Sequence, residues 1–223
     1  MHPHRGIETI SYLYCGQMTH RDSIGNEDTI RDGEVQWMTA GSGILHEEKL
    51  PVSERLLGVQ LWLNLPAKDK MVLPTYRSIK NAEIEEIELD NGKLRLLAGV
   101  FEGRKGYISK YLPLDYYDIQ LNENASVSIK TKRERSVILF TLLGEAYIGG
   151  VLVNEKKAVK LSFGDYVEIK ATDRKSKVLF ISSILLNEPV AWGGPIVMNT
   201  KEELLKAFDD LKKGHFLRNN IAY

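Results

Sequence analysis

The sequence predicts an all-β protein made of two tandem β-barrels and followed by one C-terminal α-helix. Most of the chain consists of short segments rich in β-branched and aromatic residues, separated by glycine, aspartate and asparagine turns, which is typical of sandwiches and barrels. The two halves share this texture, which indicates a duplicated barrel. Only the last segment has its apolar residues at helical spacing.

The first half is expected to contain five strands with clear turn signals between them. They cover residues 8–15, 17–22, 28–31, 34–39 and 56–65. Gly25 and Asn26 tolerate positive φ angles, so they predict a hairpin between the second and third strands. The boundary between the halves falls in residues 68–91, where the acidic run 83–88 predicts a solvated face or an exposed strand edge.

The second half repeats the pattern and ends in the helix. Its expected strands cover residues 94–100, 106–112, 116–121, 125–131, 137–143, 146–148, 158–161, 166–169 and 178–184. Thr200 and Glu203 have the spacing of a capping box, apolar residues follow at helical intervals, and Gly214 is placed to end the helix. The predicted domains are therefore a first barrel at 1–80, a second at 93–199 and a helix at 200–214.

Composition excludes several classes of protein. The 223 residues include 30 Lys and Arg against 30 Asp and Glu, 43% apolar residues and one cysteine. One cysteine cannot form a disulfide scaffold, and the apolar content is too high for disorder. No run approaches the roughly 20 apolar residues that span a bilayer. Zero net charge argues against direct binding of nucleic acid. We therefore expect a cytoplasmic protein without membrane or nucleic-acid contacts.

The histidines are unevenly distributed along the chain. Four of the five lie within the first 46 residues, and none occurs between Glu47 and Gly214. Any imidazole chemistry therefore belongs to the first barrel.

Two pairs of potential metal ligands stand out in this region. His2 and His4 are two residues apart, so on an extended chain both imidazoles point to one face. His46 and Glu48 repeat the spacing with an imidazole and a carboxylate. Two adjacent strands would thus offer three nitrogens and one oxygen, a set that suits Fe(II), Mn(II), Ni(II), Cu(II) or zinc. The residues alone also allow a disordered N-terminus and an ordinary surface histidine at position 46.

Several segments together resemble the signature blocks of the pirin family. They are residues 2–9 (HPHRGIET), 20–26 (HRDSIGN), 33–48 (GEVQWMTAGSGILHEE) and 189–200 (PVAWGGPIVMNT). The likeness extends over nearly the whole chain, and the run 33–48 is far more specific than a generic His-x-His. The chain is thereby identified as a member of the pirin family.

The resemblance implies two tandem barrels of the cupin superfamily, with one divalent transition metal in the first and none in the second. Fe(II) is the expected metal, with Mn, Ni, Cu or Zn as alternatives. By resemblance the metal ligands are His2, His4, His46 and Glu48. Glu8 is expected to lie outside the ligand set and to orient an imidazole. His20 is expected to be packed or hydrogen-bonded and not a ligand.

The resemblance also implies a function, with an alternative of another class. The first is a metal-dependent dioxygenase acting on a flavonol such as quercetin, with Glu48 as the catalytic base. The second is a redox- or metal-responsive regulator that binds a transcription-related protein. Pirins usually carry a stretch before the His-Pro-His segment, whereas His2 here follows the first Met. The first barrel is therefore expected to be shortened, with exposed strand edges that favour a homo-oligomer.

Overall fold

The computed structural model describes residues 1–218, and these fall into two compact units. The first unit combines Met1–Asn81 with the described residues from Leu186 onward, and the second is Ala82–Leu185. Almost every regular element is a strand, and α1 (Lys201–Lys212) is the one α-helix of the described residues, beside the short turns η1 (Ala67–Asp69) and η2 (Asn81–Glu83). None of the helical segments within 1–218 has the length and apolar character needed to cross a membrane.

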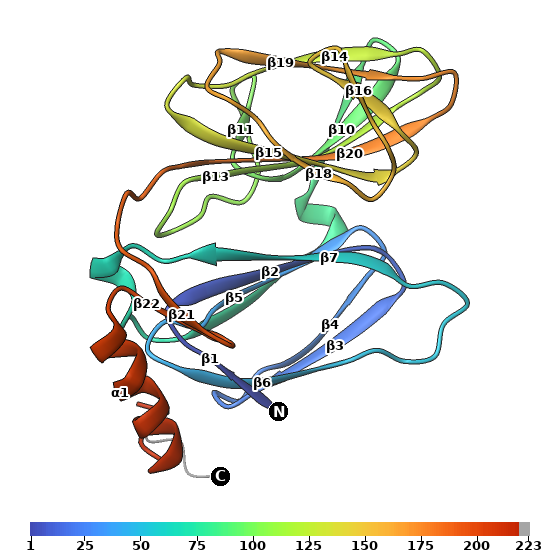
Figure 1. Cartoon of the computed structure of the whole chain (residues 1–223). Helices are drawn as coiled ribbons and strands as arrows, with labels where there is room; N and C mark the ends of the chain where they lie inside the picture. Colours follow the sequence, from blue (N-terminus) through green and yellow to red (C-terminus); the bar gives the residue numbers. More distant parts are fainter. Residues whose placement is uncertain (219–223) are drawn as a thin grey trace. The chain divides into compact units, whose positions relative to one another are not determined.

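The first unit is built from two antiparallel four-stranded sheets (Figure 1). One sheet has the order β1 (His2–His4), β6 (Ile44–Lys49), β3 (Gln17–Asp22) and β4 (Glu27–Arg31). The other has the order β7 (Leu57–Asn64), β2 (Ile7–Cys15), β5 (Glu34–Thr39) and β8 (Thr75–Ile79). The hairpin predicted at Gly25 joins β3 to β4, and Gly25 has the expected positive φ of 92°.

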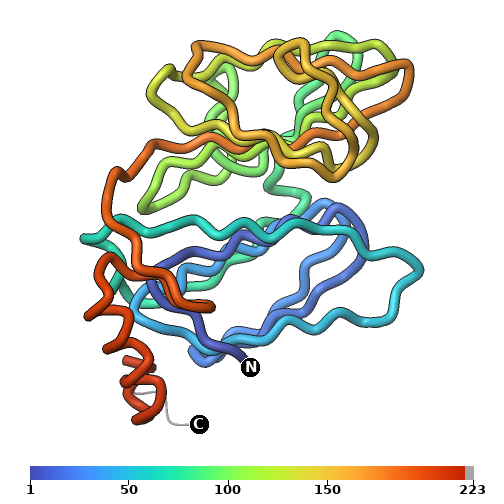
Figure 2. The backbone as a smooth tube through the Cα atoms, viewed as in Figure 1, coloured from blue at the N-terminus to red at the C-terminus, as the bar shows by residue number. Residues whose placement is uncertain are grey.

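The C-terminal segment returns to the first unit, as the red end of the chain shows in Figure 2. It forms a hairpin of β21 (Ala191–Gly193) and β22 (Ile196–Met198), followed by α1. Ile196 bridges to Arg5, and Ile196 and Met198 pack against the helix residues Ala207 and Leu204. The compact units thus differ from the predicted boundaries, because the chain from Leu186 onward belongs to the first unit, where Ile196 and Val197 contact Arg5.

The second unit again consists mainly of two sheets. The six-stranded sheet has the order β18 (Ala158–Lys160), β15 (Arg135–Leu143), β20 (Ser176–Ile184), β13 (Leu114–Leu121), β10 (Gly92–Ala98) and β9 (Glu85–Leu89). The four-stranded sheet has the order β14 (Ser126–Lys130), β19 (Tyr166–Ala171), β16 (Ala146–Ile148) and β17 (Val151–Val153), and β11 (Val100–Phe101) pairs with β12 (Arg104–Lys105). The apolar residues that alternate along these strands, among them Leu94 on β10, Ile119 on β13 and Val178 on β20, pack into one core.

Most predicted elements are confirmed, and the exceptions have local causes. The capping box forms as expected, with the Thr200 hydroxyl accepting from the Glu203 amide, and Gly214 has the positive φ of 74° found after helix ends. Most of the acidic run lies in β9, an outer strand of its sheet, in agreement with the second of the two predicted alternatives. The strand predicted at 106–112 was wrong, because only Tyr107 makes a bridge there. The short strands β8, β12, β17, β21 and β22 were missed, since two to five residues carry little periodicity.

Candidate metal centre

Three of the four predicted ligands come together on the sheet that begins with β1. The antiparallel register sets His2 opposite His46 and His4 opposite Ile44. The ring centroids of His2 and His46 lie 4.2 Å apart, and His4 lies 5.0 Å from each of the other two. One ring nitrogen from each histidine lies within 4.8 Å of those of the others. The period of two residues along each strand therefore places three imidazoles around one point.

The environment of His46 keeps its imidazole neutral. The ring is fully buried, and neither of its nitrogens has a hydrogen-bond partner among the described residues. Burial, helped by repulsion from His2, His4 and His20, lowers the pKa of His46 to about 2. A buried polar atom without a partner is costly, and in the neutral ring one nitrogen keeps a lone pair that a metal ion can take up.

His4 is held in one tautomer by the C-terminal hairpin. Its Nδ1 lies 3.1 Å from the carbonyl oxygen of Pro195. A carbonyl can only accept, so Nδ1 carries the proton and Nε2 keeps its lone pair. That Nε2 lies 3.2 Å from Nε2 of His2. Burial lowers the pKa of His4 to about 4, so at neutral pH its Nε2 is available to a cation.

Glu48 shares a strand with His46 but stands outside the group of three imidazoles. Its Oε1 accepts hydrogen bonds from Nε2 of Gln36 at 2.8 Å and Nε2 of Gln60 at 3.0 Å. Ser11 Oγ lies 3.4 Å from the same oxygen, and Gln60 also reaches Oε2 at 3.1 Å. The three polar partners bind the carboxylate from the facing sheet.

These partners form one row across that sheet, and sequence reasoning missed them. Ser11 on β2 is directly opposite Gln36 on β5 and Gln60 on β7. The available signal was the isolated glutamine in the apolar run LLGVQLWLNL, since a lone polar side chain among apolar neighbours indicates a polar partner. Trp62, two residues further, donates from Nε1 to Oε1 of Gln60 at 3.1 Å and lies 5.2 Å from the His4 ring.

The role expected for Glu8 was wrong. Glu8 and Ser11 have opposite parity on β2, so Glu8 points away from the face that meets Glu48. Its Oε1 accepts from Nε1 of Trp37 at 3.0 Å and from Oγ1 of Thr39 at 2.7 Å. Burial raises the pKa of the Glu8 carboxyl. The carboxylate is therefore bound to an indole and a hydroxyl, and no imidazole is among these two partners.

His20 is packed and hydrogen-bonded, as expected. Its Nε2 lies 2.9 Å from Oδ2 of Asp22. Its ring stacks on that of Tyr76, with 4.2 Å between the ring centroids and an angle of 10° between the ring planes. The ring is fully buried, and its centroid lies 5.4 Å from that of His46. His20 thus packs next to His46 but does not belong to the group of three imidazoles.

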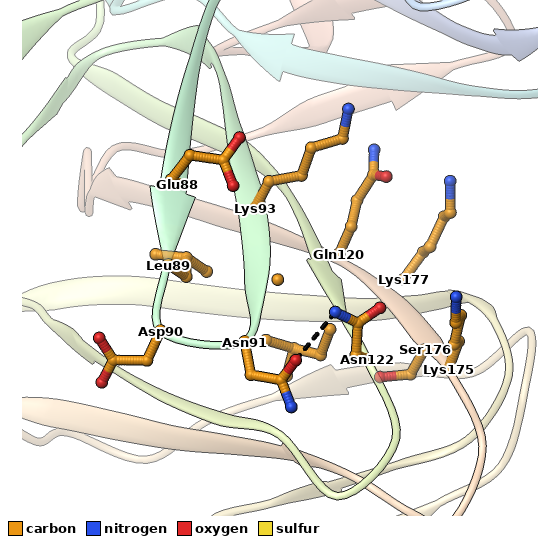
Figure 3. A pocket seen from close by; sticks show the side chains of 12 residues that line it. Glu88, Leu89, Asp90, Asn91, Lys93, Gln120, Asn122, Lys175, Ser176 and Lys177 are labelled. Carbon is orange, nitrogen blue, oxygen red and sulfur yellow. Dashed lines mark hydrogen bonds between the residues drawn. The ribbon is translucent and has the colours of Figure 1, made fainter.

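The second unit has a cavity of a different character. A hollow of about 550 Å³ opens at one end of the six-stranded sheet. Figure 3 shows Lys93, Gln120 and Lys177 side by side on three neighbouring strands, with Asn122 bonded to Asn91 at 2.9 Å. None of the residues around the hollow is a histidine. Within residues 1–218, the one metal-type cluster that includes imidazoles is His2, His4 and His46.

Comparison with known proteins supports the resemblance along the whole chain. The family described as pirin matches residues 1–63, and the pirin C-terminal cupin domain matches residues 116–217. The Thermoplasma acidophilum protein named "Putative quercetin 2,3-dioxygenase Ta0133" is 37% identical, over 98% of this chain and 92% of that protein. Human pirin is 36% identical over 95% of this chain and 75% of its own length.

Solved structures share the fold. A quercetin 2,3-dioxygenase from Acinetobacter baumannii superposes with a TM-score of 0.91 at 35% identity, covering 96% of this chain and 77% of that one. The bacterial pirin YhhW from Escherichia coli, in complex with nickel(II), superposes with a TM-score of 0.67 at 25% identity, covering 82% and 76%. Both units are therefore cupin barrels, and the chain belongs to the pirin family.

Proposed function

We propose that the first barrel binds one divalent transition metal through His2, His4, His46 and Glu48, and that the protein is a dioxygenase acting on a flavonol such as quercetin. Fe(II) is the metal we expect. The observation that carries the proposal is the convergence of three imidazoles, one of which is buried with both nitrogens unbonded. The nickel complex of YhhW and the dioxygenase names of two relatives support it.

The described residues fit such a metal. Two of the three imidazoles are kept neutral by burial, and the tautomer of His4 leaves Nε2 as the ligand atom. Glu48 lies two residues from His46 on the same strand face, so its carboxylate is the nearest anionic group along β6 on that face. Nitrogen and carboxylate ligands together suit first-row metals from Mn(II) to Zn(II).

The metal, when bound, would supply Lewis acidity and one-electron chemistry toward O₂. The protein residues have separate tasks. Glu48 accepts the proton of a substrate hydroxyl, and the amides of Gln36 and Gln60 hold its carboxylate toward the interior. Trp62 is 41% exposed and offers an indole face to a flat aromatic substrate.

Turnover of quercetin by protein loaded separately with Fe(II), Mn(II), Ni(II) and Cu(II) tests the proposal. We expect loss of the flavonol absorbance and uptake of O₂ with at least one metal. Metal bound without turnover in all four forms would reject the dioxygenase and favour the regulator. The 36% identity to mammalian pirins supports that second candidate, which predicts a protein partner that distinguishes metal-bound from metal-free protein.

Glu48→Gln tests the catalytic base. The variant keeps the size of the side chain but cannot take up a proton, so at equal measured metal content we expect turnover to fall by about 10²- to 10⁴-fold. The neighbouring Glu47→Gln is the matched control, since Glu47 pairs with Arg21 and Lys49 and not with the glutamines. Equal turnover in wild type and Glu48→Gln would remove Glu48 from the mechanism.

A further inference from the structure

The strand that carries two of the three imidazoles is short and lies at the edge of its sheet. β1 has three residues and pairs with β6 alone within the four-stranded sheet. A three-residue strand that pairs on one side only is weakly held, because it makes few backbone hydrogen bonds. A metal site built on it needs support from another part of the chain.

The C-terminal hairpin gives that support along the free side of the N-terminal segment. Arg5, the residue after β1, bridges Ile196 of β22, and the amide of Val197 donates to the carbonyl of Arg5 at 3.0 Å. The carbonyl of Pro195, in the turn of the same hairpin, accepts from Nδ1 of His4. Figure 1 shows β1 passing beside β21 and β22. The N-terminal segment thus pairs with β6 through residues 2–4 and contacts the hairpin through His4 and Arg5.

The backbone at Gly6, the residue after Arg5, lies close against the backbone of Val197 in β22. A Cβ atom at Gly6 would come within 1.9 Å of the carbonyl oxygen of Val197, so only glycine fits there. The buried Lys70 donates from Nζ to the carbonyls of both Gly6 and Val197 at 2.9 Å, and to Oδ1 of Asn64 at 2.7 Å. This ammonium group ties the N-terminal and C-terminal segments together.

Arg5 connects the segment to α1 and to the residues after it. The side chain is 2% exposed, and its guanidinium donates to Oδ2 of Asp210 at 2.8 Å and to the carbonyl of Phe216 at 2.8 Å. It also lies 4.2 Å from the centre of the Phe216 ring. A buried guanidinium with these partners has one favourable position, and that position sets the residue next to His4.

We propose that the C-terminal segment 191–216 positions the two N-terminal histidines for metal binding, with Asp210 as a positioning residue that acts through Arg5 and with the Pro195 carbonyl selecting the tautomer of His4. The inference rests on the proposed metal site. Its physical basis is preorganisation: a strand that is already ordered does not lose conformational entropy when it binds the ion, so affinity is higher.

Asp210→Asn and Asp209→Asn are the variants that test this. Each removes one negative charge from α1 and one i,i+4 ion pair, to Lys206 and Lys213 respectively, but only Asp210 reaches Arg5. Affinity for Ni(II) is measured by competition with a chelator. We expect Asp210→Asn to bind about tenfold more weakly, at the low end of losses seen when partners of ligands are removed. Asp209→Asn should bind as wild type does.

A second readout separates positioning from a loss of stability. Nitrogen-15 spectra of metal-free protein at neutral pH report the tautomer of His4. We expect a protonated Nδ1 in wild type and Asp209→Asn, and a mixture of tautomers in Asp210→Asn. Should Asp210→Asn fail to fold, Arg5→Lys replaces it, because a lysine keeps the charge but cannot reach both Asp210 and the Phe216 carbonyl.

The outcomes distinguish this inference from the proposed function. Wild-type affinity and tautomer in a folded Asp210→Asn protein would overturn the positioning role while leaving the metal site intact. If wild type binds no Ni(II), Fe(II) or Zn(II), the proposed function fails, and the His4 tautomer alone decides whether the C-terminal segment positions that ring.

Discussion

His46 is the residue on which the metal centre depends most directly. Its ring is fully buried between His2, His4 and His20, and its nitrogens have no protein partner among the described residues. His2, by contrast, is exposed. Of the three imidazoles, His46 therefore contributes the most rigid ligand, because packing fixes its rotamer.

His46→Ala should abolish metal loading while the second barrel stays folded. The substitution removes a ligand that the two other histidines cannot replace, since His2 and His4 share one short strand. Elemental analysis after purification with Fe(II) or Ni(II) measures the loss. His215→Ala is the control, because His215 is exposed and outside the cluster. Unchanged metal content in His46→Ala would contradict the ligand assignment.

The low pKa of His46 predicts a pH dependence of stability in metal-free protein. In the unfolded chain His46 gains a proton below its ordinary pKa of 6.5, whereas the folded pKa is about 2. Between pH 6.5 and 4 the unfolded state binds more protons, so the free energy of unfolding falls as pH falls. One such group contributes a slope of up to about 1.4 kcal/mol per pH unit.

Urea unfolding at a series of pH values, in the presence of a chelator, measures this slope. The cavity left by His46→Ala costs stability equally at every pH, so the difference between wild type and variant isolates the titration of the imidazole. We expect the difference to shrink steadily from pH 6.5 to pH 4. A difference that is constant over this range would show that the folded protein protonates His46 as readily as the unfolded chain.

At the scale of elements, the helix α1 covers the hairpin that borders β1. Ala207 and Phe216 pack with Ile196 and Met198, while Leu205 faces solvent with 58% exposure. The same helix supplies Asp210 to the buried Arg5. The helix thus packs its apolar side chains against β22 and forms an ion pair with the N-terminal segment.

Ending the chain at Asn199 should destabilise the first barrel and expose an apolar surface. Arg5 would lose both of its hydrogen-bond acceptors, and an unpaired buried charge costs about 3–5 kcal/mol. We expect a lower melting temperature and lower solubility, measured by calorimetry and light scattering. Leu205→Ala, on the exposed face, should change stability by about 0.5 kcal/mol or less. Unaltered melting and solubility of the shortened chain would mean that α1 does not stabilise the unit.

The edge position of β1 bears on the expectation of a homo-oligomer. β1 and β4 are the outer strands of their sheet. Beside Arg5, however, the edge is occupied by β22. The C-terminal hairpin therefore reduces the surface that a second copy could pair with.

At the scale of the whole molecule, metal binding should act on one unit. The three imidazoles and the hairpin residue Pro195 all belong to the first unit, while β13, β15 and β20 form the centre of the second. A ligand that binds only the folded state stabilises the part of the chain that it contacts.

Hydrogen exchange followed by mass spectrometry should show this division. On addition of Ni(II) we expect slower exchange in peptides covering β1, β6 and the hairpin of β21 and β22. Peptides covering β13, β15 and β20 should exchange at unchanged rates and serve as the internal control. Equal slowing in both units would contradict a site confined to the first barrel.

The sequence by itself determined the features that depend on neighbours along the chain. Strand positions follow from the period of two residues, and the helix follows from its capping box at Thr200 and Glu203. The same period placed His2 and His4 on one face. It also paired His46 with Glu48, and the family likeness then identified the four residues as one ligand set.

Only the tertiary structure decided what surrounds those side chains. The row of Ser11, Gln36 and Gln60 that binds Glu48 depends on the registers of β2 with β5 and β7. The carbonyl at position 195 reaches His4 across 191 positions of sequence. Such contacts arise from register and packing between distant segments, so no local pattern in the sequence encodes them. For the same reason the role predicted for Glu8 was wrong, and the C-terminal hairpin was assigned to the wrong barrel.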